Sequence, residues 1–398
     1  MSDNIQEREI IRKSFGLKKD ILPQLEASYD SPLIDKIKSQ DYELIAGRLK
    51  IKLAREFGFC YGVDRAIEYA YETRTKFPDK RIFLTNEIIH NPQVNSKLSE
   101  LGIKFLTKTA NSLNMEDVGP EDVVLIPAFG NPTLELKKLQ ARGCILVDTT
   151  CGSVMSVWKR VESYSRDGFT AAIHGKYDHE ETLATSSRAN KYVVIRDRRQ
   201  TDIICGYIEG RVKSEEFFAE FKNALSDNFD PALDLGYLGC ANQTTMLSSE
   251  SMEIASLLRE SMIRRHGEQE TANRFRHFDT ICSATQDRQD AVLRLVREGI
   301  DLMIVVGGYN SSNTGHLVEI SLESCPAYHV KDAGCILSKD LIQHKKVMSH
   351  EIIDSTNWLP EGPAVIGVTA GASTPNRVIQ EVIERILDVG GCSGEKRI

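Results

Sequence analysis

The stretch that decides the fold reads Leu53-Ala54-Arg55-Glu56-Phe57-Gly58-Phe59-Cys60. It starts as an apolar run of the kind that forms strands, and it ends at a cysteine. Apolar residues then recur at helical spacing, at Val63, Ala66, Ile67 and Ala70. The change of period predicts a strand-to-helix junction with Cys60 at the start of the helix.

Two further cysteines have similar local settings. Cys151 follows Cys144-Ile145-Leu146-Val147-Asp148-Thr149-Thr150, Cys282 follows Phe275-Arg276-His277-Phe278-Asp279-Thr280-Ile281, and helical patterns come after both. A cysteine at a helix N-terminus faces unpaired N–H groups and the positive end of the helix dipole, which favours its thiolate. Three such thiolates suit one soft metal centre, and three ligands rather than four leave a coordination position open for catalysis.

The composition limits the class of protein. The chain has 398 residues, 41% of them hydrophobic and 27% charged, as expected for a soluble globular protein of two or three domains. No run of about 18 apolar residues exists, so we expect no membrane span. The net charge of −7 argues against nucleic acid as a partner. The N-terminal residues include several acids and no apolar signal region, so we expect a cytoplasmic protein.

The cysteine count points to free or metal-bound thiols. The chain has nine cysteines, an odd number, and no C-x-x-C pair. This pattern favours a reducing compartment over a disulfide framework. Six of the cysteines are expected to be buried small hydrophobic residues: Cys144, Cys205, Cys240, Cys325, Cys335 and Cys392.

Strand-like runs alternate with helical patterns from about residue 51. The expected strands are Arg81–Leu84, Asp122–Pro127, Cys144–Val147, Phe169–Ile173, Lys191–Ile195, Asp301–Val306 and Pro363–Thr369. Such alternation predicts an α/β fold with mostly parallel sheets.

We expect five parts along the chain. Residues 1–50 form an N-terminal arm to which we assign no chemistry. Three α/β units follow at 51–150, 151–280 and 281–370, and the second carries an insertion at 196–236 with one amphipathic helix. Residues 371–398 form a C-terminal helix and tail that close the site.

Polar loops after several of the strands are candidate site segments. Ligands of open α/β sheets bind outside the carboxyl ends of the strands, where these loops lie. His90 follows one strand, and His179 lies two positions from Glu181 after another. A histidine beside a carboxylate suits proton transfer, although the same residues are common on ordinary surfaces.

Hydroxyl-rich loops offer oxyanion sites. Thr244 and Thr245 suit hydrogen bonds to an oxyanion, but they also suit a helix N-cap, and taken by themselves the residues favour the cap. One such loop, after a strand and two glycines, is Asn310-Ser311-Ser312-Asn313. The loop that contains Ser373 also follows a strand and also consists of small residues. Backbone N–H groups at such turns bind phosphate. No Walker A, G-x-G-x-x-G or G-x-S-x-G motif accompanies them, which argues against ordinary nucleotide and hydrolase folds.

Taken together, these motifs resemble the LytB/IspH family from about residue 51 to about residue 390. They occur in the family's order: Gly58-Phe59-Cys60-Tyr61-Gly62-Val63-Asp64-Arg65-Ala66, Asp148-Thr149-Thr150-Cys151, Gln243-Thr244-Thr245, Ile281-Cys282-Ser283-Ala284-Thr285, Asn310-Ser311-Ser312-Asn313 and Val368-Thr369-Ala370-Gly371-Ala372-Ser373.

The resemblance implies a three-lobed, trefoil-like arrangement of α/β units around one [4Fe-4S] cluster per chain. It implies that Cys60, Cys151 and Cys282 are the metal ligands and that the fourth iron is open. The implied activity is that of an iron–sulfur oxidoreductase of isoprene biosynthesis. It removes the hydroxyl group of (E)-4-hydroxy-3-methylbut-2-enyl diphosphate and yields isopentenyl and dimethylallyl diphosphates, the last step of the methylerythritol phosphate pathway.

The resemblance also implies roles for the polar loops. The catalytic residues would be Glu181 as proton relay, Thr244 beside the substrate hydroxyl, and His179. The substrate-binding residues would be His90, His179, Thr244, Thr245, Ser311, Ser312, Asn313 and Ser373.

One departure from the family pattern is Phe129. Many bacterial members have a histidine there, and phenylalanine cannot donate a hydrogen bond to the diphosphate. The departure, the arm and the insertion resemble the plant and cyanobacterial branch. That branch implies reduced ferredoxin, or flavodoxin, as the electron donor.

Two alternatives stay open at this point. A quinolinate synthase-like enzyme would also use three cysteines and one open iron, but it would not need these serine-rich loops. A non-enzymatic iron–sulfur redox sensor would need a cluster but no substrate cradle.

Overall fold

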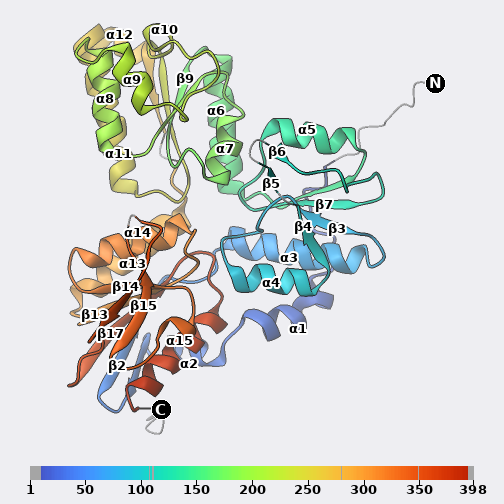
Figure 1. Ribbon diagram of the computed structural model, residues 1–398, viewed down its shortest axis with the longest axis vertical. Helices are drawn as coiled ribbons and strands as arrows, with labels where there is room; N and C mark the ends of the chain where they lie inside the picture. Colours follow the sequence, from blue (N-terminus) through green and yellow to red (C-terminus); the bar gives the residue numbers. More distant parts are fainter. Residues whose placement is uncertain (1–9, 107, 110–111, 279, 348, 393–398) are drawn as a thin grey trace. The chain divides into compact units, whose positions relative to one another are not determined.

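The computed structural model describes residues 10–106, 108–109, 112–278, 280–347 and 349–392 (Figure 1). The chain divides into two compact units, and each unit is assembled from three segments of sequence. Unit 1 contains the residues up to Lys13, Asp79–Ile88 and Gly102–Cys282. Unit 2 contains Ser14–Pro78, Ile89–Leu101 and the residues from Ser283 onward.

Unit 1 contains two four-stranded parallel sheets. The first has the strand order β4-β3-β7-β8. Its strands and the other elements of this region are β3 (Ile82–Leu84), β4 (Ile103–Phe105), the short pair β5 (Lys108–Thr109) and β6 (Ser112–Leu113), β7 (Val123–Ile126), α5 (Thr133–Ala141) and β8 (Ile145–Asp148). All four residues of β7 are buried, as expected for an inner parallel strand.

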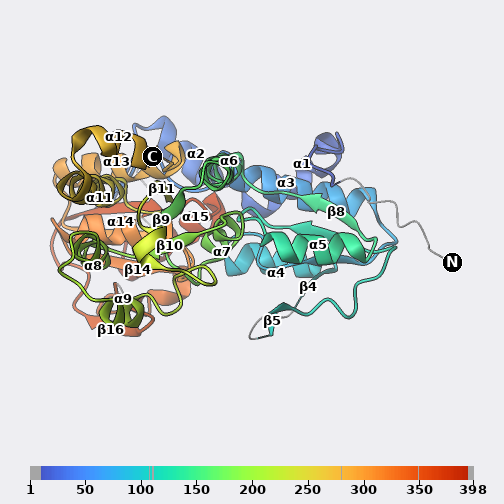
Figure 2. The same cartoon turned by 90° about the horizontal axis from the view of Figure 1, so that it is seen from above.

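The second sheet of unit 1 has the order β10-β9-β11-β12. Its strands are β9 (Thr170–His174), β10 (Tyr192–Ile195), β11 (Leu238–Asn242) and β12 (Phe275–His277). The helices of this region are α6 (Gly152–Arg166), α7 (Glu180–Ser186), α8 (Arg198–Ile208), α9 (Ser214–Glu220), α10 (Pro231–Asp234), α11 (Ser248–His266) and α12 (Glu268–Arg274). Helices α8 and α11 pack side by side, as both views show (Figures 1 and 2).

Unit 2 is built on a seven-stranded sheet of order β1-β2-β17-β13-β14-β15-β16. Its strands are β1 (Glu43–Ala46), β2 (Leu49–Leu53), β13 (Leu302–Val306), β14 (Ala327–Val330), β15 (Leu341–Lys345), β16 (Ile352–Thr356) and β17 (Ala364–Ala370). Strand β2, from early in the chain, pairs in parallel with β17 from its end, so blue and red ribbons lie together in Figure 1.

The helices of unit 2 come from all three of its segments. They are α1 (Lys18–Tyr29), α2 (Pro32–Ser39), α3 (Tyr61–Lys76), α4 (Pro92–Glu100), α13 (Ser283–Arg297), α14 (Ser312–Leu322), the 3₁₀ turn η1 (Ala333–Cys335) and α15 (Asn376–Val389). The apolar face of α15 packs on the main core of this unit, with Val378, Val382 and Ile386 all at most 1% exposed.

The N-terminal arm is anchored to unit 2 by one buried carboxylate. Glu72 on α3 is 0% exposed and accepts hydrogen bonds from the Ser14 hydroxyl and from the backbone N–H groups of Phe15 and Leu17, at 2.8–2.9 Å. The arm then continues into α1, α2 and β1, so residues 14–50 form part of the core of unit 2.

The predicted α/β class with mostly parallel sheets is confirmed. Both four-stranded sheets are parallel throughout, and the seven-stranded sheet has three parallel and three antiparallel pairings. Each of the seven expected strands is present within one or two residues of its predicted bounds. The insertion at 196–236 differs from the prediction: it holds three helices, α8, α9 and α10, rather than one. Within the part of the chain that the structure describes, no helix is both long enough and apolar enough to cross a membrane.

Candidate functional site

The three cysteines of interest lie at helix N-termini, as predicted. Cys60 is the N-cap residue of α3, Cys151 is the N-cap residue of α6, and Cys282 directly precedes α13. All three side chains are partly exposed. All three thiols therefore lie at the positive end of a helix dipole and are accessible to a metal.

The other six cysteines differ from these three. Five are buried, as predicted, whereas Cys325 is only partly buried. Burial raises the pKa of Cys205 to about 11 and the pKa of Cys240 to about 12. Burial also raises the pKa of Cys325. A protonated, buried thiol is a poor metal ligand, so burial separates five of these cysteines from the three candidates. Cys325 is partly exposed like the candidates, but it follows the C-terminal end of α14 instead of preceding a helix.

Each of the three junctions is fixed by a backbone hydrogen bond to a second loop. The Cys60 N–H donates to the carbonyl of Ala372 at 3.2 Å. The Cys151 N–H donates to Ala128 at 3.0 Å, and the Cys282 N–H donates to Thr244 at 3.4 Å. The accepting loops are the ones that contain Ser373, Phe129 and Thr244, so the cysteines and the polar loops are positioned together within each unit.

In unit 1, Glu181 and Thr244 form a buried pair. Glu181 lies in the first turn of α7 and is 1% exposed. Its Oε1 accepts the backbone N–H of Thr244 at 2.6 Å, and its Oε2 accepts the Thr244 hydroxyl at 3.1 Å. These two hydrogen bonds hold the Thr244 hydroxyl and its backbone in one orientation beside the carboxyl group.

His179 is the N-cap residue of α7. Its Nδ1 accepts the backbone N–H of Glu181 at 3.1 Å, so the neutral ring carries its proton on Nε2. The ring of Phe129 meets the ring of His179 edge-on, with centroids 5.6 Å apart and planes at 78°. The residue that departs from the family pattern therefore packs against a predicted site histidine and restricts its orientation.

The Thr244 loop is not a helix cap. Helix α11 begins at Ser248 with Leu247 as its N-cap residue, so the capping alternative for Thr244 and Thr245 is wrong. Gln243, which we did not predict as a site residue, holds this loop. It is 1% exposed, accepts the Lys176 N–H and the Thr182 hydroxyl at 3.1 Å, and donates to the Thr245 hydroxyl at 2.8 Å.

In unit 2, the loop after β13 has the geometry of an anion cradle. Ser311 caps α14 by accepting the Thr314 N–H at 3.2 Å, and Ser312 is the first residue of the helix. The side-chain oxygen of Asn313 accepts the Ala372 N–H at 3.0 Å. The Nδ2 of Asn313 is buried and has no hydrogen-bond partner among the described residues, so it is a donor that a bound oxyanion could satisfy.

His90 and Ser373 belong to the same region of unit 2. The Ser373 hydroxyl donates to the His90 carbonyl at 3.2 Å, and both residues are less than 8% exposed. Gly308 lies so close to this carbonyl that a Cβ at position 308 would be 2.2 Å from its oxygen. The predicted residues His90, Ser311, Ser312, Asn313 and Ser373 are thus joined through a few short contacts.

Arg288 is a further residue that sequence reasoning missed. It is 4% exposed on α13, and its guanidinium donates to the carbonyls of Gly58 at 2.6 Å and Phe59 at 3.2 Å. It therefore fixes the segment that leads into Cys60. One feature of the sequence could have indicated this role: Arg288 is a single arginine on the helix face otherwise formed by the apolar residues Ala291, Val292 and Leu295.

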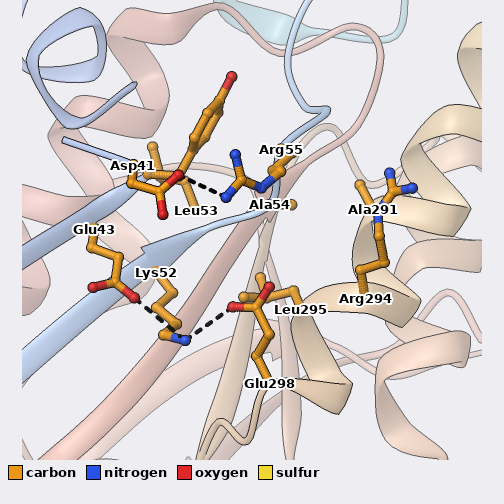
Figure 3. Close-up of a pocket in the computed structure, with 11 residues that line it drawn as sticks. Asp41, Glu43, Lys52, Leu53, Ala54, Arg55, Ala291, Arg294, Leu295 and Glu298 are labelled. Atoms are coloured by element: carbon orange, nitrogen blue, oxygen red, sulfur yellow. Dashed lines mark hydrogen bonds and ion pairs between the residues drawn. The ribbon is translucent and has the colours of Figure 1, made fainter. Parts of the chain in front are cut away.

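A separate cavity of about 230 Å³ lies in unit 2 (Figure 3). Five of its six charged lining residues are paired with one another: Arg55 contacts Asp41 at 2.7 Å, and Lys52 bridges Glu43 at 3.4 Å and Glu298 at 2.9 Å. The sixth is Arg294. None of the predicted site residues lines it. This cavity is therefore not the candidate site.

Comparison with known proteins identifies the family. Residues 51–387 match the LytB protein family. A relative from Gloeobacter violaceus (strain ATCC 29082 / PCC 7421), named 4-hydroxy-3-methylbut-2-enyl diphosphate reductase, is 45% identical over 97% of this chain and 94% of its own length. The protein of the same name from Microcystis aeruginosa (strain NIES-843 / IAM M-2473) is 47% identical over 94% of each chain.

Solved structures agree with this assignment. The structure of (E)-4-hydroxy-3-methyl-but-2-enyl diphosphate reductase, the terminal enzyme of the non-mevalonate pathway, has a TM-score of 0.50 and 26% identity, and the match covers 85% of this chain and 99% of that chain. The Plasmodium falciparum E-1-hydroxy-2-methyl-but-2-enyl-4-diphosphate reductase structure has a TM-score of 0.61 at 23% identity, over 85% and 87% of the two chains, and supports the fold. The chain belongs to the LytB protein family.

Proposed function

We propose that this chain reduces (E)-4-hydroxy-3-methylbut-2-enyl diphosphate to isopentenyl and dimethylallyl diphosphates, the last step of the non-mevalonate isoprenoid pathway. The family match and the names of the relatives support this reaction over quinolinate synthase-like chemistry or a redox sensor. The reaction replaces a C–O bond with a C–H bond. It consumes two electrons and two protons and releases one water.

One observation carries the proposal. Thr244 is bonded at once to a candidate metal ligand and to a candidate proton donor: its carbonyl accepts the Cys282 N–H, while its own N–H and hydroxyl bind Glu181. Thr244 thereby connects the proposed proton donor to a proposed cluster ligand through hydrogen bonds on both sides. Loss of a hydroxyl group as water requires this combination of an electron source and a proton donor.

Cys60, Cys151 and Cys282 are the proposed ligands of a [4Fe-4S] cluster with one open iron. The fit rests on the chemistry of the donors, since these three thiols are partly exposed at helix N-termini. When bound, the cluster supplies electrons and a Lewis-acidic iron for the substrate oxygen.

Glu181 is the proposed proton donor and Thr244 the residue that directs the proton. A carboxyl group buried at 1% exposure keeps its proton transfer away from bulk water. Because the Thr244 hydroxyl already bonds Oε2 of Glu181, a proton can pass from the carboxyl group through this hydroxyl to the leaving oxygen. His179 is proposed to donate from Nε2 to an oxygen of the substrate, and Thr245 to support the loop through Gln243.

The proposed diphosphate cradle comprises His90, Ser311, Ser312, Asn313 and Ser373. The positive end of the α14 dipole and the unpartnered amide of Asn313 both favour an anion. We also propose reduced ferredoxin or flavodoxin as the electron donor. All nine cysteines are free thiols, which is consistent with a reducing compartment such as the cytoplasm.

The direct test is product formation under anaerobic conditions. Cluster-loaded protein is incubated with dithionite-reduced methyl viologen and the diphosphate substrate, and five-carbon diphosphates are quantified. We expect isopentenyl and dimethylallyl diphosphates. An intact, reducible cluster without either product would refute the proposed reaction.

Variants test the assigned roles separately. Glu181→Gln should retain the cluster and substrate binding but lose at least a hundredfold in turnover, as expected for loss of a general acid. Glu180→Gln, the matched control on the neighbouring residue, should retain turnover within a factor of three. Equal rates in the two variants would remove Glu181 from the proton path.

The cradle is tested through substrate affinity. Asn313→Asp replaces the unpartnered donor with an acceptor, so we expect substrate affinity to fall at least tenfold because the new carboxylate repels the diphosphate. Unchanged affinity in this variant would contradict the cradle assignment.

A further inference from the structure

Helix α6, which starts at Cys151, has an exposed stripe that the proposed chemistry leaves unused. Its members are spaced so that they share one face of the helix: Gly152, Ser156, Lys159, Arg160, Ser163 and Arg166. Five of the six are exposed and Ser163 is partly exposed. The stripe therefore runs along the surface of unit 1, starting next to a proposed cluster ligand.

The stripe carries positive charge, although the chain as a whole is negatively charged. The chain has a net charge of −7, yet Lys159, Arg160 and Arg166 have no ion-pair partner among the residues that the structure describes. The acid at the end of the helix, Asp167, is already paired with Arg276, and Glu162 lies on the flank of the stripe. The local field therefore favours a partner with negative charge.

An exposed aromatic residue borders the same stripe. Phe278 is 40% exposed, and the guanidinium of Arg160 lies over its ring at 4.1 Å from the centroid. Phe278 precedes Cys282 by four residues, so this pair is adjacent in sequence to a second proposed cluster ligand. Arginine and aromatic side chains are the residue types enriched at protein interfaces and at their energetic hot spots.

The end of the stripe nearest Cys151 has no bulky side chains. A Cβ added to Gly152 would meet nothing within 4 Å, and Ser156 follows one turn later. A partner surface can therefore approach the backbone around Cys151 closely. Close approach matters because the rate of electron tunnelling falls steeply with distance.

We propose that this face of α6, together with Phe278, is the docking surface for a small acidic electron-transfer protein that reduces the cluster. The inference rests on the proposed function, since it assumes a cluster at these cysteines. Each carrier gives up one electron and is oxidised, so two reduced carriers are consumed per product. Charge steers the encounter, and the Arg160–Phe278 pair supplies the contact at the centre of the interface.

The test compares two reductants in the same holoenzyme. The double variant Lys159→Glu/Arg160→Glu should lose at least tenfold in kcat/KM for a reduced [2Fe-2S] ferredoxin at low salt, and the loss should shrink as salt increases. Turnover driven by reduced methyl viologen should stay within twofold of the parent protein. Phe278→Ala should weaken ferredoxin-driven turnover without this salt dependence.

Matched controls lie elsewhere on unit 1. Lys222→Glu reverses an exposed charge away from the stripe, and Phe218→Ala removes a phenylalanine that is 42% exposed on α9. Both should behave like the parent protein with both reductants. If they lose as much as the stripe variants, the effect is not local and the docking proposal is wrong.

The other outcomes are equally decisive. Unchanged ferredoxin kinetics in the stripe variants would place the docking surface elsewhere, and a parallel loss with methyl viologen would show an effect on the site itself. Absence of viologen-driven turnover in the parent protein would refute the proposed function instead. In that case the surface is tested by titrating oxidised ferredoxin, whose binding the double variant should weaken at least tenfold.

Discussion

The protonation of His329 provides a quantitative test of how unit 2 supports its cradle. His329 lies on β14 and is 2% exposed, and its Nε2 is 3.0 Å from the carbonyl oxygen of Gly307. Its ring also meets Tyr309 edge-on, with centroids 5.2 Å apart. Gly307 and Tyr309 lie four and two residues before Ser311, so the neutral ring holds the backbone that leads into the proposed cradle.

Burial is the largest cause of the lowered pKa of His329, which is about 4. The hydrogen bonds to the backbone of Gly307 and Gly308 raise this pKa, and the nearby Lys345 lowers it. The unfolded chain, with its ordinary pKa of 6.5, therefore binds more protons between these two values. The stability contributed by the neutral ring is complete above pH 6.5 and is lost as the pH falls towards 4. Linkage predicts a loss of about 2 kcal/mol between pH 7.5 and pH 5.

The assay is urea unfolding of the parent protein and of His329→Gln at both pH values. Glutamine can still donate to the Gly307 carbonyl but does not titrate. The free energy of unfolding of the parent protein minus that of the variant is therefore compared at the two pH values. Any change in this difference comes from the titration of His329. Trp358, 3% exposed in the same unit, reports unfolding by fluorescence. A difference between the two proteins that is the same at both pH values would refute the reasoning.

Three further predictions concern packing. Glu72→Gln removes the charge that accepts three donors of the arm, so the free energy of unfolding should fall by about 2–3 kcal/mol and limited proteolysis should cut the arm sooner. Gly130→Ala places a Cβ 2.3 Å from the Trp158 ring at a φ of +78°, so unfolding in urea should show a loss of about 2 kcal/mol or more. Gly308→Ala displaces the His90 carbonyl, so KM for the diphosphate substrate should rise at least tenfold while thermal stability changes less than in Gly130→Ala.

The sheets were predictable because buried parallel strands have a strong local signal. Leu302–Val306 is a continuous apolar run, and all five of its residues are at most 1% exposed. The pairing of β2 with β17 was not predictable, because residues so far apart in sequence leave no local pattern that specifies the contact. The helices of the 196–236 insertion were only partly predicted, since α8 has polar residues at most of its first positions.

The position of the three cysteines at helix N-termini was predictable from the sequence, whereas the residues that hold the polar loops were not. Composition alone cannot distinguish a hydroxyl that caps a helix from one that binds a ligand. For Thr244, only the observed start of α11 at Ser248 excluded the capping role. Ser311 is a helix cap and a proposed ligand at once. Arg288 has its partners on a distant segment, the carbonyls of Gly58 and Phe59, so its role was visible only in three dimensions.

The parallel pairing of β2 with β17 has a consequence for how the protein is made. Ile51 pairs with Ile366, more than 300 residues later, so a ribosome working at about 5–20 residues per second completes β2 roughly 15 to 60 seconds before its partner strand exists. During that interval β2 can pair with β1 on one edge, but its other edge and the adjoining Cys60 segment lack their partners from the end of the chain. The Cys60 N–H donates to the carbonyl of Ala372, so the thiol of Cys60 reaches its native position only after synthesis is nearly complete.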